Sequence, residues 1–336
     1  MTPVVRWLAL GAGGLAVAAA LALGLLFYVF GAPGPLAGPT LVVVPKGVGV
    51  SAIGDLMVRH GIVRSALVFE AGVRITGNAG ALRAGEYQIP AKASARAVME
   101  ILRAGKTYVR RLTAPEGTTT VQVVNLVTAA HGLVGENGPI PAEGALLPDT
   151  YHYSWGDRRR DVIAGMERAM TETVASLWRE RAADLPIRTP GEAVILASIV
   201  EKETGKPEER ALIAGVFYNR LHLGMALQSD PTVAYGRAVA AEIPERVLGR
   251  PLTRKDLETP DPFNTYLNRG LPPQPICNPG RAALLAVLHP APTDALYFVA
   301  DGSGGHVFAK TLDEHNRNVA RWRRLRDGRQ LAPAAP

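Results

Sequence analysis

Two glutamates follow directly on one of the most apolar segments of the chain. In TPGEAVILASIVEKETG (189–205), positions 193–200 are apolar except for Ser198, and the segment then reaches Glu201 and Glu203. At the C-terminal end of a buried helix, the helix dipole and the apolar surroundings both disfavour negative charge, so a carboxyl group there tends to keep its proton. A carboxyl group protonated near neutral pH can serve as a general acid, as cleavage of a glycosidic bond requires.

Helix geometry distinguishes the two glutamates. At about 100° per residue, the side chains of Glu201 and Glu203 point about 200° apart, so only one of them can face a given cleft. Glu201 lies on the same side as Ala197 and Ser198 and continues the buried face, which makes it the candidate general acid. The alternative is that both glutamates, with Lys202 between them, form a solvated last turn.

The elements that must position Glu201 are marked by local signals. Thr189 with Glu192 three residues later is a capping box, and Pro190 suits the first helical position. A long amphipathic helix is expected at 161–181, because its apolar residues recur on one face. These residues are Ile163, Met166, Met170, Val174 and Leu177.

The N-terminal region lacks charge over an unusual length. From Trp7 to Pro45 there is no Asp, Glu, Lys or Arg, and the 24 residues 7–30 are almost all apolar, close to the ~20 that span a bilayer. We expect residues 1–31 to form a short cytoplasmic tip and one transmembrane anchor, with Arg6 keeping the N-terminus inside. The alternative is a cleaved signal peptide, whose apolar region is usually shorter, at about 7 to 15 residues.

The amino-acid composition favours some classes of binding partner over others. The chain carries 37 Lys and Arg against 30 Asp and Glu, a formal net charge of +7, which suits anionic wall polymers or lipids. The expected extracytoplasmic location argues against nucleic acid. Cys277 is the single cysteine and the seven histidines show no i, i+4 pair on a helix, so we expect no disulfide, metal or cofactor.

The predicted fold class is α+β in two parts beyond the anchor. Residues 32–40 are a predicted Gly/Pro linker, 41–107 a small α+β module, 108–325 a mixed α+β catalytic domain and 326–336 a disordered tail. Hydrophobic periodicity predicts five elements in the module. They are a strand at 41–44, helices at 51–60 and 66–76, a strand within 82–90 and a helix at 93–106.

Several blocks of sequence resemble the successive motifs of the MltG/YceG family of endolytic murein transglycosylases. The blocks are PEGTT (115–119), EGALLPDTYHY (143–153), ILASIVEKETG (195–205) and the segments 209–236, 252–280 and 296–316. The wording of VPKGVGVSAIGDLMVRHGIV and LRAGEYQIP resembles the LysM-like module that precedes the catalytic domain in this family. The resemblance covers about residues 41–318.

The resemblance implies a reaction and a location. Glu201 corresponds to the first glutamate of the family's VEKE element, which is catalytic. The implied reaction cleaves the MurNAc-β-1,4-GlcNAc bond within nascent peptidoglycan strands and leaves 1,6-anhydro-MurNAc ends, with Glu201 as general acid and then base. The implied setting is the bacterial inner membrane, with glycan strands and peptidoglycan synthases as partners.

Two polar clusters are the predicted substrate-binding residues. Polar side chains that can hydrogen-bond sugar hydroxyl and N-acetyl groups occur in LQSDPTVAYG and in FNTY. They are Gln228, Ser229, Asp230, Thr232, Tyr235, Asn264, Thr265 and Tyr266. The alternative is turn chemistry, since Asp-Pro at 230–231 commonly starts a turn and Asn264 can brace a loop.

Two other functions stay open from the residues alone. A membrane-anchored scaffold could bind peptidoglycan without cutting it, and would tolerate the loss of Glu201. A muramidase would hydrolyse the same bond, and a hydrolase generally needs a second positioned carboxylate. Candidates for that second group are Asp149, Asp230 and Glu143.

Overall fold

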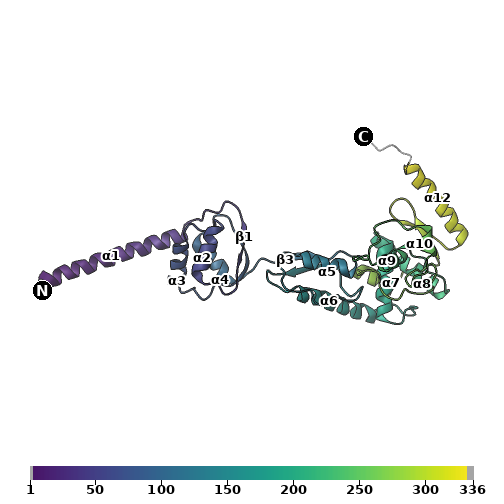
Figure 1. Ribbon diagram of the computed structural model, residues 1–336, viewed down its shortest axis with the longest axis horizontal. Helices are drawn as coiled ribbons and strands as arrows, with labels where there is room; N and C mark the ends of the chain where they lie inside the picture. Colours follow the sequence, from purple (N-terminus) through teal and green to yellow (C-terminus); the bar gives the residue numbers. More distant parts are fainter. Residues whose placement is uncertain (1–2, 331–336) are drawn as a thin grey trace. The chain divides into compact units, whose positions relative to one another are not determined.

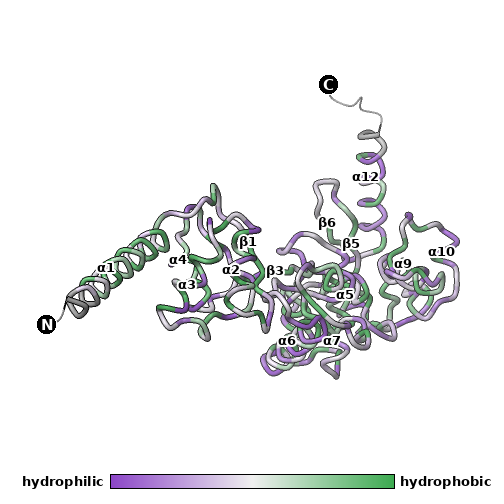
Figure 2. The backbone as a smooth tube through the Cα atoms, turned by 60° about the vertical axis from the view of Figure 1, so that its left-hand side comes forward, coloured by the Kyte–Doolittle hydropathy of each residue, from purple (hydrophilic) through white to green (hydrophobic). Residues whose placement is uncertain are grey.

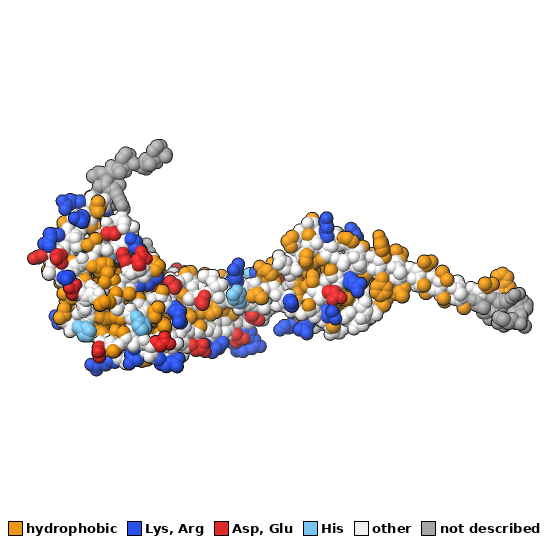
Figure 3. Space-filling view, turned by 180° about the vertical axis from the view of Figure 1, so that it is seen from behind, with side chains coloured by type: hydrophobic (Ala, Val, Ile, Leu, Met, Phe, Trp, Pro, Cys, Tyr) orange, Lys and Arg blue, Asp and Glu red, His pale blue; other side chains and the backbone are white. Residues whose placement is uncertain are grey.

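The apolar N-terminal stretch forms a single long helix. In the computed structural model, which describes residues 3–330, α1 runs Pro3–Gly31, and its part Leu10–Gly31 is long and apolar enough to cross a membrane. Figure 2 shows α1 predominantly hydrophobic along its described length. Figure 3 shows side chains of this kind along its outer surface. By length and composition, α1 is therefore a possible membrane helix.

The chain divides into two units, each with its own apolar core. Unit 1 comprises Met1–Arg110 with His152–Asp157, and unit 2 comprises Arg111–Tyr151 with Arg158–Pro336. Both contain helices and short antiparallel or paired strands (Figure 1), so the predicted mixed α+β class is confirmed. The predicted boundary after residue 107 lies three residues before the end of the first segment of unit 1.

Unit 1 contains the five elements that periodicity predicts for the module. They are β1 (Thr40–Val44), α2 (Val50–Arg59), α3 (Ala66–Ile75), β2 (Gly85–Ile89) and α4 (Ala95–Ala104). The strands are antiparallel, with Val42 opposite Tyr87. Gly105 ends α4 with a φ of 67°, a left-handed conformation that glycine adopts without a Cβ penalty. The buried core of this unit includes Phe30 of α1 beside Met57 and Phe69.

The Gly/Pro segment 32–40 differs from the expected free linker, because it is bonded to the module. The Gly34 amide donates to the Lys92 carbonyl (3.1 Å), and the Lys92 amide donates to the Leu36 carbonyl (2.9 Å). A Cβ at Gly34 would lie 2.2 Å from the carbonyl oxygen of Ala93. The lack of periodicity correctly excluded a helix here, but it carried no information about packing against a segment about sixty residues away.

Unit 2 consists mainly of helices, with two pairs of short strands that lie wholly or partly in it. Its helices are α5 (Thr120–Ala129), α6 (Arg159–Arg179), α7 (Pro190–Glu203), α8 (Arg210–His222), α9 (Asp230–Ala240), α10 (Arg254–Glu258), α11 (Arg281–Leu288) and α12 (Leu312–Gln330), with a 3-10 turn at Pro207–Glu209. Its strand pairs are β3 (Arg110–Thr113) with β4 (Thr150–Tyr153), and β5 (Tyr297–Ala300) with β6 (His306–Ala309). The helix α12 extends to Gln330, past the expected end at 325, and residues 331–336 of the predicted tail lie outside the described residues.

The helix α7 lies at the centre of unit 2. It contacts α6, α8, α9 and α11, and Leu196, Ile199 and Val200 are fully buried. The predicted capping box is confirmed, since the Thr189 hydroxyl accepts from the Glu192 amide and the Glu192 carboxylate accepts from the Thr189 amide. The predicted apolar face of α6 is also confirmed, with all five of its predicted residues buried. This packing fixes the C-terminal turn of α7, which carries the candidate acid.

Candidate active site

Glu201 is nearly buried and its charge has partners from two other helices. Its side chain is 4% exposed. One carboxylate oxygen accepts from Nη2 of Arg210 on α8 (3.2 Å), and the other accepts from the backbone N–H of Gly280 (2.9 Å). Gly280 is the N-cap of α11, so the positive end of that helix dipole faces the carboxylate. The carboxyl group of Glu201 thus has polar partners that its apolar sequence neighbours do not reveal.

Glu116 is a functional candidate that sequence reasoning missed. It lies in the loop before α5, and one of its carboxylate oxygens is 3.6 Å from Nη2 of Arg210, the atom that also bonds Glu201. Burial raises the pKa of Glu116, the negative charge of Glu201 raises it further, and Arg210 lowers it. The PEGTT block carried this residue, but no spacing in the sequence connects position 116 with position 201.

Glu203 has a separate environment, as the 200° separation predicts. The Ser229 hydroxyl donates to its carboxylate. Burial raises the pKa of Glu203 to about 7, with the Ser229 hydrogen bond and Arg220 lowering it and Asp230 raising it. Of the two glutamates, Glu203 is thus the one whose pKa burial raises, as expected for a carboxyl group at the end of an apolar helix.

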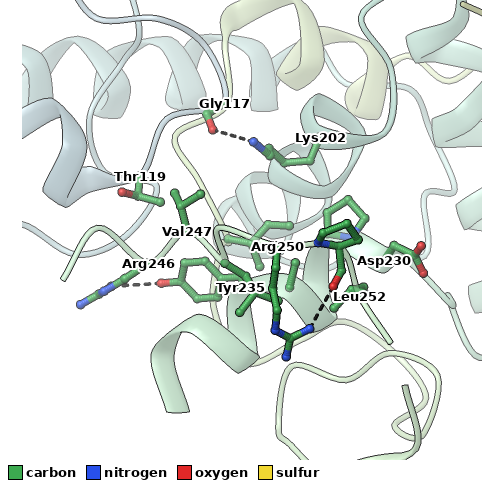
Figure 4. A pocket seen from close by; sticks show the side chains of 14 residues that line it. Gly117, Thr119, Lys202, Asp230, Tyr235, Arg246, Val247, Arg250 and Leu252 are labelled. Atoms are coloured by element: carbon green, nitrogen blue, oxygen red, sulfur yellow. Dashed lines mark hydrogen bonds between the residues drawn. The ribbon is translucent and has the colours of Figure 1, made fainter. Parts of the chain in front are cut away.

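A cavity of about 570 Å³ lies beside the end of α7. Lys202 reaches from α7 across the cavity, and its Nζ donates to the carbonyl of Gly117 (3.3 Å; Figure 4). Asp230, Arg246 and Arg250 also line the cavity, together with apolar side chains. The cavity therefore touches the residues next to Glu201 in sequence and in space, namely Lys202 and Gly117. Mixed apolar and polar lining is typical of small-ligand sites.

Three of the predicted substrate-binding residues expose polar groups. Gln228 and Asp230 are exposed, and Tyr266 is partly exposed. The Tyr266 hydroxyl donates to the Asp230 carboxylate (2.6 Å), so the two predicted clusters do come together. Gln228 has a φ of 52°, an uncommon conformation for a residue with a side chain. Strain of this kind is often found at functional sites.

The other five predicted binding residues are buried and bonded within the protein. The Ser229 amide donates to the Thr265 hydroxyl (3.0 Å), which lies 2.9 Å from the Thr232 hydroxyl. The Asn264 side-chain amide donates to the carbonyls of residues 257 and 259, and its oxygen accepts from the Tyr266 amide. Tyr235 donates to Glu143 (3.1 Å). For Asn264 this matches the alternative of a loop brace, and the group as a whole holds the segment that carries Gln228 and Asp230.

The three candidate second carboxylates occupy different places. Glu143 is buried and accepts from the Thr120 amide (2.6 Å) and from Arg246 (3.3 Å), so it braces the interior. Asp149 is exposed at the start of β4. Asp230 lines the cavity. Asp230 is therefore the best placed of the three to act beside a bound ligand.

An Asn-Pro pair such as Asn278-Pro279 is typical of a helix start with Asn as its cap, but Asn278 has a different role here. The helix α11 begins at Arg281 rather than near Pro279, with Gly280 at its N-cap. The Asn278 side chain instead accepts from the Leu146 amide (2.9 Å) and donates to the Thr118 carbonyl (3.1 Å). It thus fixes the loop that carries Glu116 against the segment that leads into α11.

The described residues 3–330 contain no group of three or more His, Cys, Asp or Glu side chains that could hold a metal ion. Cys277 is buried, and its thiol donates to the Ser198 carbonyl (3.3 Å). Burial raises the pKa of this thiol, which disfavours the reactive thiolate. The chemistry of the site therefore centres on its carboxyl groups.

Comparisons with known proteins show which family this chain resembles. The sequence model described as YceG-like family matches residues 42–321. A Bacillus subtilis (strain 168) protein named endolytic murein transglycosylase is 32% identical over 309 residues, covering 82% of this chain and 82% of the relative. One of the same name from Streptococcus pneumoniae serotype 2 is 29% identical over 321 residues, and the match spans 57% of its length.

A solved structure is also similar to this chain. The crystal structure of a YceG-like protein from Listeria monocytogenes is 29% identical, with a TM-score of 0.51, and the match covers 84% of this chain and 99% of that one. The family match spans residues 42–321, and the relatives and the solved structure each cover more than four fifths of this chain. The chain belongs to the YceG-like family.

Proposed function

We propose that this chain is an endolytic murein transglycosylase whose acid–base residue is Glu201. The observation that carries the proposal is a nearly buried carboxyl group held by Arg210 and the N-terminus of α11. Its neighbours Lys202 and Gly117 line a cavity of about 570 Å³. The names of the Bacillus and Streptococcus relatives support the substrate class, the glycan strands of peptidoglycan.

The proposed reaction needs one carboxyl group and consumes no water. Glu201 gives its proton to the leaving oxygen O4 of GlcNAc as the bond from C1 of MurNAc to that oxygen breaks. The resulting carboxylate then takes the proton of the MurNAc C6 hydroxyl, whose oxygen bonds to C1 and closes the 1,6-anhydro ring. Glu201 ends protonated, as it began. Arg210 and the Gly280 amide stabilise the carboxylate formed between the two steps.

We propose two roles for the predicted binding residues. Gln228, Asp230 and Tyr266 contact the sugar directly, because their polar groups are accessible. Ser229, Thr232, Tyr235, Asn264 and Thr265 position them from below, through the hydrogen bonds described above. The cationic cavity residues Lys202, Arg246 and Arg250 add attraction for the carboxylates of the substrate.

The proposed location follows from α1 and the charge pattern. We propose that α1 is a single-pass anchor in the inner membrane, with the N-terminus cytoplasmic and both units outside. The module at 41–107 is proposed to be LysM-like and to bind glycan. Peptidoglycan synthases, which act on the same strands at the same membrane face, are the proposed protein partners.

The test uses the full chain in detergent with uncrosslinked glycan strands and reads the products by mass spectrometry. We expect internal fragments with 1,6-anhydro ends from the wild type, and a loss of at least ~100-fold in rate for Glu201→Gln, as for other acid–base residues. Glu208→Gln is the matched control, because Glu208 is exposed on the 3-10 turn. It should cleave like the wild type.

The other outcomes identify the alternatives. Reducing ends in place of anhydro ends would mean a muramidase. Asp230 would then be the first residue to mutate in the search for the second catalytic carboxylate. Equal cleavage by Glu201→Gln and wild type would remove Glu201 from the reaction. If neither protein cleaved the strands but both were retained on sacculi, the remaining function would be that of a peptidoglycan-binding scaffold.

A further inference from the structure

The cavity beside the end of α7 shares a wall with the surroundings of Glu201. Gly117 lines the cavity, and a Cβ at this glycine would lie 3.5 Å from Cδ of Lys202 and 3.6 Å from Cγ of Glu201. Figure 4 shows the Lys202 side chain directed to the Gly117 carbonyl. One glycine thus lies between the candidate acid and the cavity, so a substituent of the sugar held at Glu201 has a short path into it.

The loop before α10 supplies an apolar part of the cavity wall. Val247 and Leu248 line the cavity, and Val247 is 46% exposed although its side chain is aliphatic. The Thr119 hydroxyl donates to the Glu245 carbonyl (2.8 Å), which fastens this loop to the start of α5. A volume of about 570 Å³ is in the range of small-ligand sites. The cavity therefore offers an occupant apolar contact as well as charge.

The two arginines that line the cavity are held by carboxylates of the protein. Arg246 pairs with Glu143 (3.3 Å), and this pair is neutral overall. Arg250 donates to both oxygens of Asp256 (2.7 and 2.9 Å), and Arg237 lies 3.5 Å from the same carboxylate. Two guanidinium groups therefore share one carboxylate, and that group keeps a net positive charge beside the cavity.

Lys202 is the cation of the cavity that binds no carboxylate within the described part of the chain. Its Nζ donates to the neutral carbonyl of Gly117 at 3.3 Å, longer than the about 2.7 to 2.9 Å of a strong charge-assisted hydrogen bond. Asp230 also lines the cavity, but its carboxylate accepts from Tyr266 (2.6 Å), and Figure 4 shows it on a different side from the Lys202 ammonium group. The Lys202 end of the cavity is therefore suited to an anionic group.

We propose that this cavity binds the acidic stem peptide of the MurNAc residue held at Glu201, and that Lys202 contacts a carboxylate of that peptide. The inference rests on the proposed function and deepens it, because it makes peptide-bearing strands the preferred substrate. The stem peptide is attached through the lactyl group of MurNAc, the sugar whose C1 bond is cleaved, so it leaves the sugar ring close to the acid. Its carboxylates match Lys202, and its alanine methyl groups match Val247 and Leu248.

The first test compares KM for uncrosslinked glycan strands with their stem peptides and for the same strands after an amidase has removed the peptides. We expect the full chain in detergent to prefer peptide-bearing strands by at least ~10-fold in KM, and Lys202→Gln to lose most of this preference. Lys202→Arg keeps the charge and should keep the preference. Lys255→Gln is the matched control, because Lys255 is exposed on α10 and does not line the cavity.

The second test measures binding without cleavage. Calorimetry of the Glu201→Gln chain with a soluble MurNAc-peptide should show binding that weakens at least ~10-fold when the peptide carboxylates are amidated or when Lys202→Gln is added. Equal KM for the two kinds of strand in the wild type, or equal binding of the acidic and amidated peptides, would overturn the inference. If the wild type cleaves nothing but Lys202-dependent peptide binding remains, the proposed function fails and the peptide site stands.

Discussion

At the scale of single residues, two positions on α7 give carboxyl groups with different partners. Glu201 faces Arg210 and the start of α11, whereas Glu203 faces Ser229. The Ser229 hydroxyl donates to Glu203, and burial raises the pKa of Glu203 to about 7. The same helix end thus holds one carboxyl group with its charge compensated and another that retains its proton to near neutral pH.

Glu203 makes the stability of unit 2 depend on pH. Between its ordinary pKa of 4.5 and about 7, the folded protein keeps a proton that the unfolded chain releases. The unfolding free energy of the wild type therefore falls as pH rises through this window. Glu203→Gln cannot ionise and its oxygen can still accept from Ser229. We expect this variant to gain about 1 to 3 kcal/mol over the wild type between pH 5 and pH 8.

Urea unfolding of both proteins at pH 5, 6, 7 and 8 measures this difference, with Glu208→Gln as the exposed control. Parallel curves for wild type and Glu203→Gln would contradict the raised pKa. If Glu203→Gln were more stable than the wild type at low pH and less stable at high pH, Glu203 would be held as a carboxylate in the folded protein.

The sequence could name Glu201 and Glu203 but not their partners. Their place after an apolar helix is a local property, and local periodicity showed it. Arg210, Gly280 and Glu116 reach the site only because α8, α11 and the loop before α5 pack around α7. Those contacts depend on tertiary packing, which local sequence patterns do not reveal.

At the scale of elements, the cap of α7 decides how firmly the site is held. Thr189 and Glu192 bond each other's backbone amides at the start of the helix. Thr189→Ala should lower the unfolding free energy by about 1 kcal/mol, the usual cost of losing such a cap. Urea unfolding of the wild type and of Thr189→Ala measures this difference in unfolding free energy. Thr171→Ala on α6, an exposed mid-helix threonine, is the matched control and should change little. Equal losses for the two variants would contradict the capping role.

Prediction of helices and strands from the sequence succeeded where the signal was local. It failed where tertiary packing determines the local structure. Periodicity and caps predicted α6 and α7 nearly in full, and the five elements of the module. The Asn278-Pro279 pair is typical of a helix start, but α11 begins at Arg281 and Asn278 bonds residues more than 130 positions earlier. The segment 32–40 looked like a spacer for the same reason, since its contacts lie far along the chain.

At the scale of the whole molecule, α1 and the module share one core. Phe30 of α1 is fully buried in unit 1, and a Cβ at Gly72 of α3 would lie 2.5 Å from its ring. Tyr28, two residues earlier, is 76% exposed. A signal peptidase cut after Phe30 would remove a core side chain from the module. The structure therefore favours retention of α1 over the cleaved signal peptide.

Because α1 and the module share this core, we expect Phe30 of α1 to stabilise the module. Phe30→Ala should cost unit 1 about 3 to 5 kcal/mol, the usual loss for a buried phenylalanine, while Tyr28→Ala should cost much less. Hydrogen–deuterium exchange of α3 and β2 amides, with the full chain in detergent, measures the difference within unit 1. Faster exchange in Phe30→Ala alone is the expected result. Equal exchange in the two variants would mean that the module folds without α1, and the mature protein could then dispense with it.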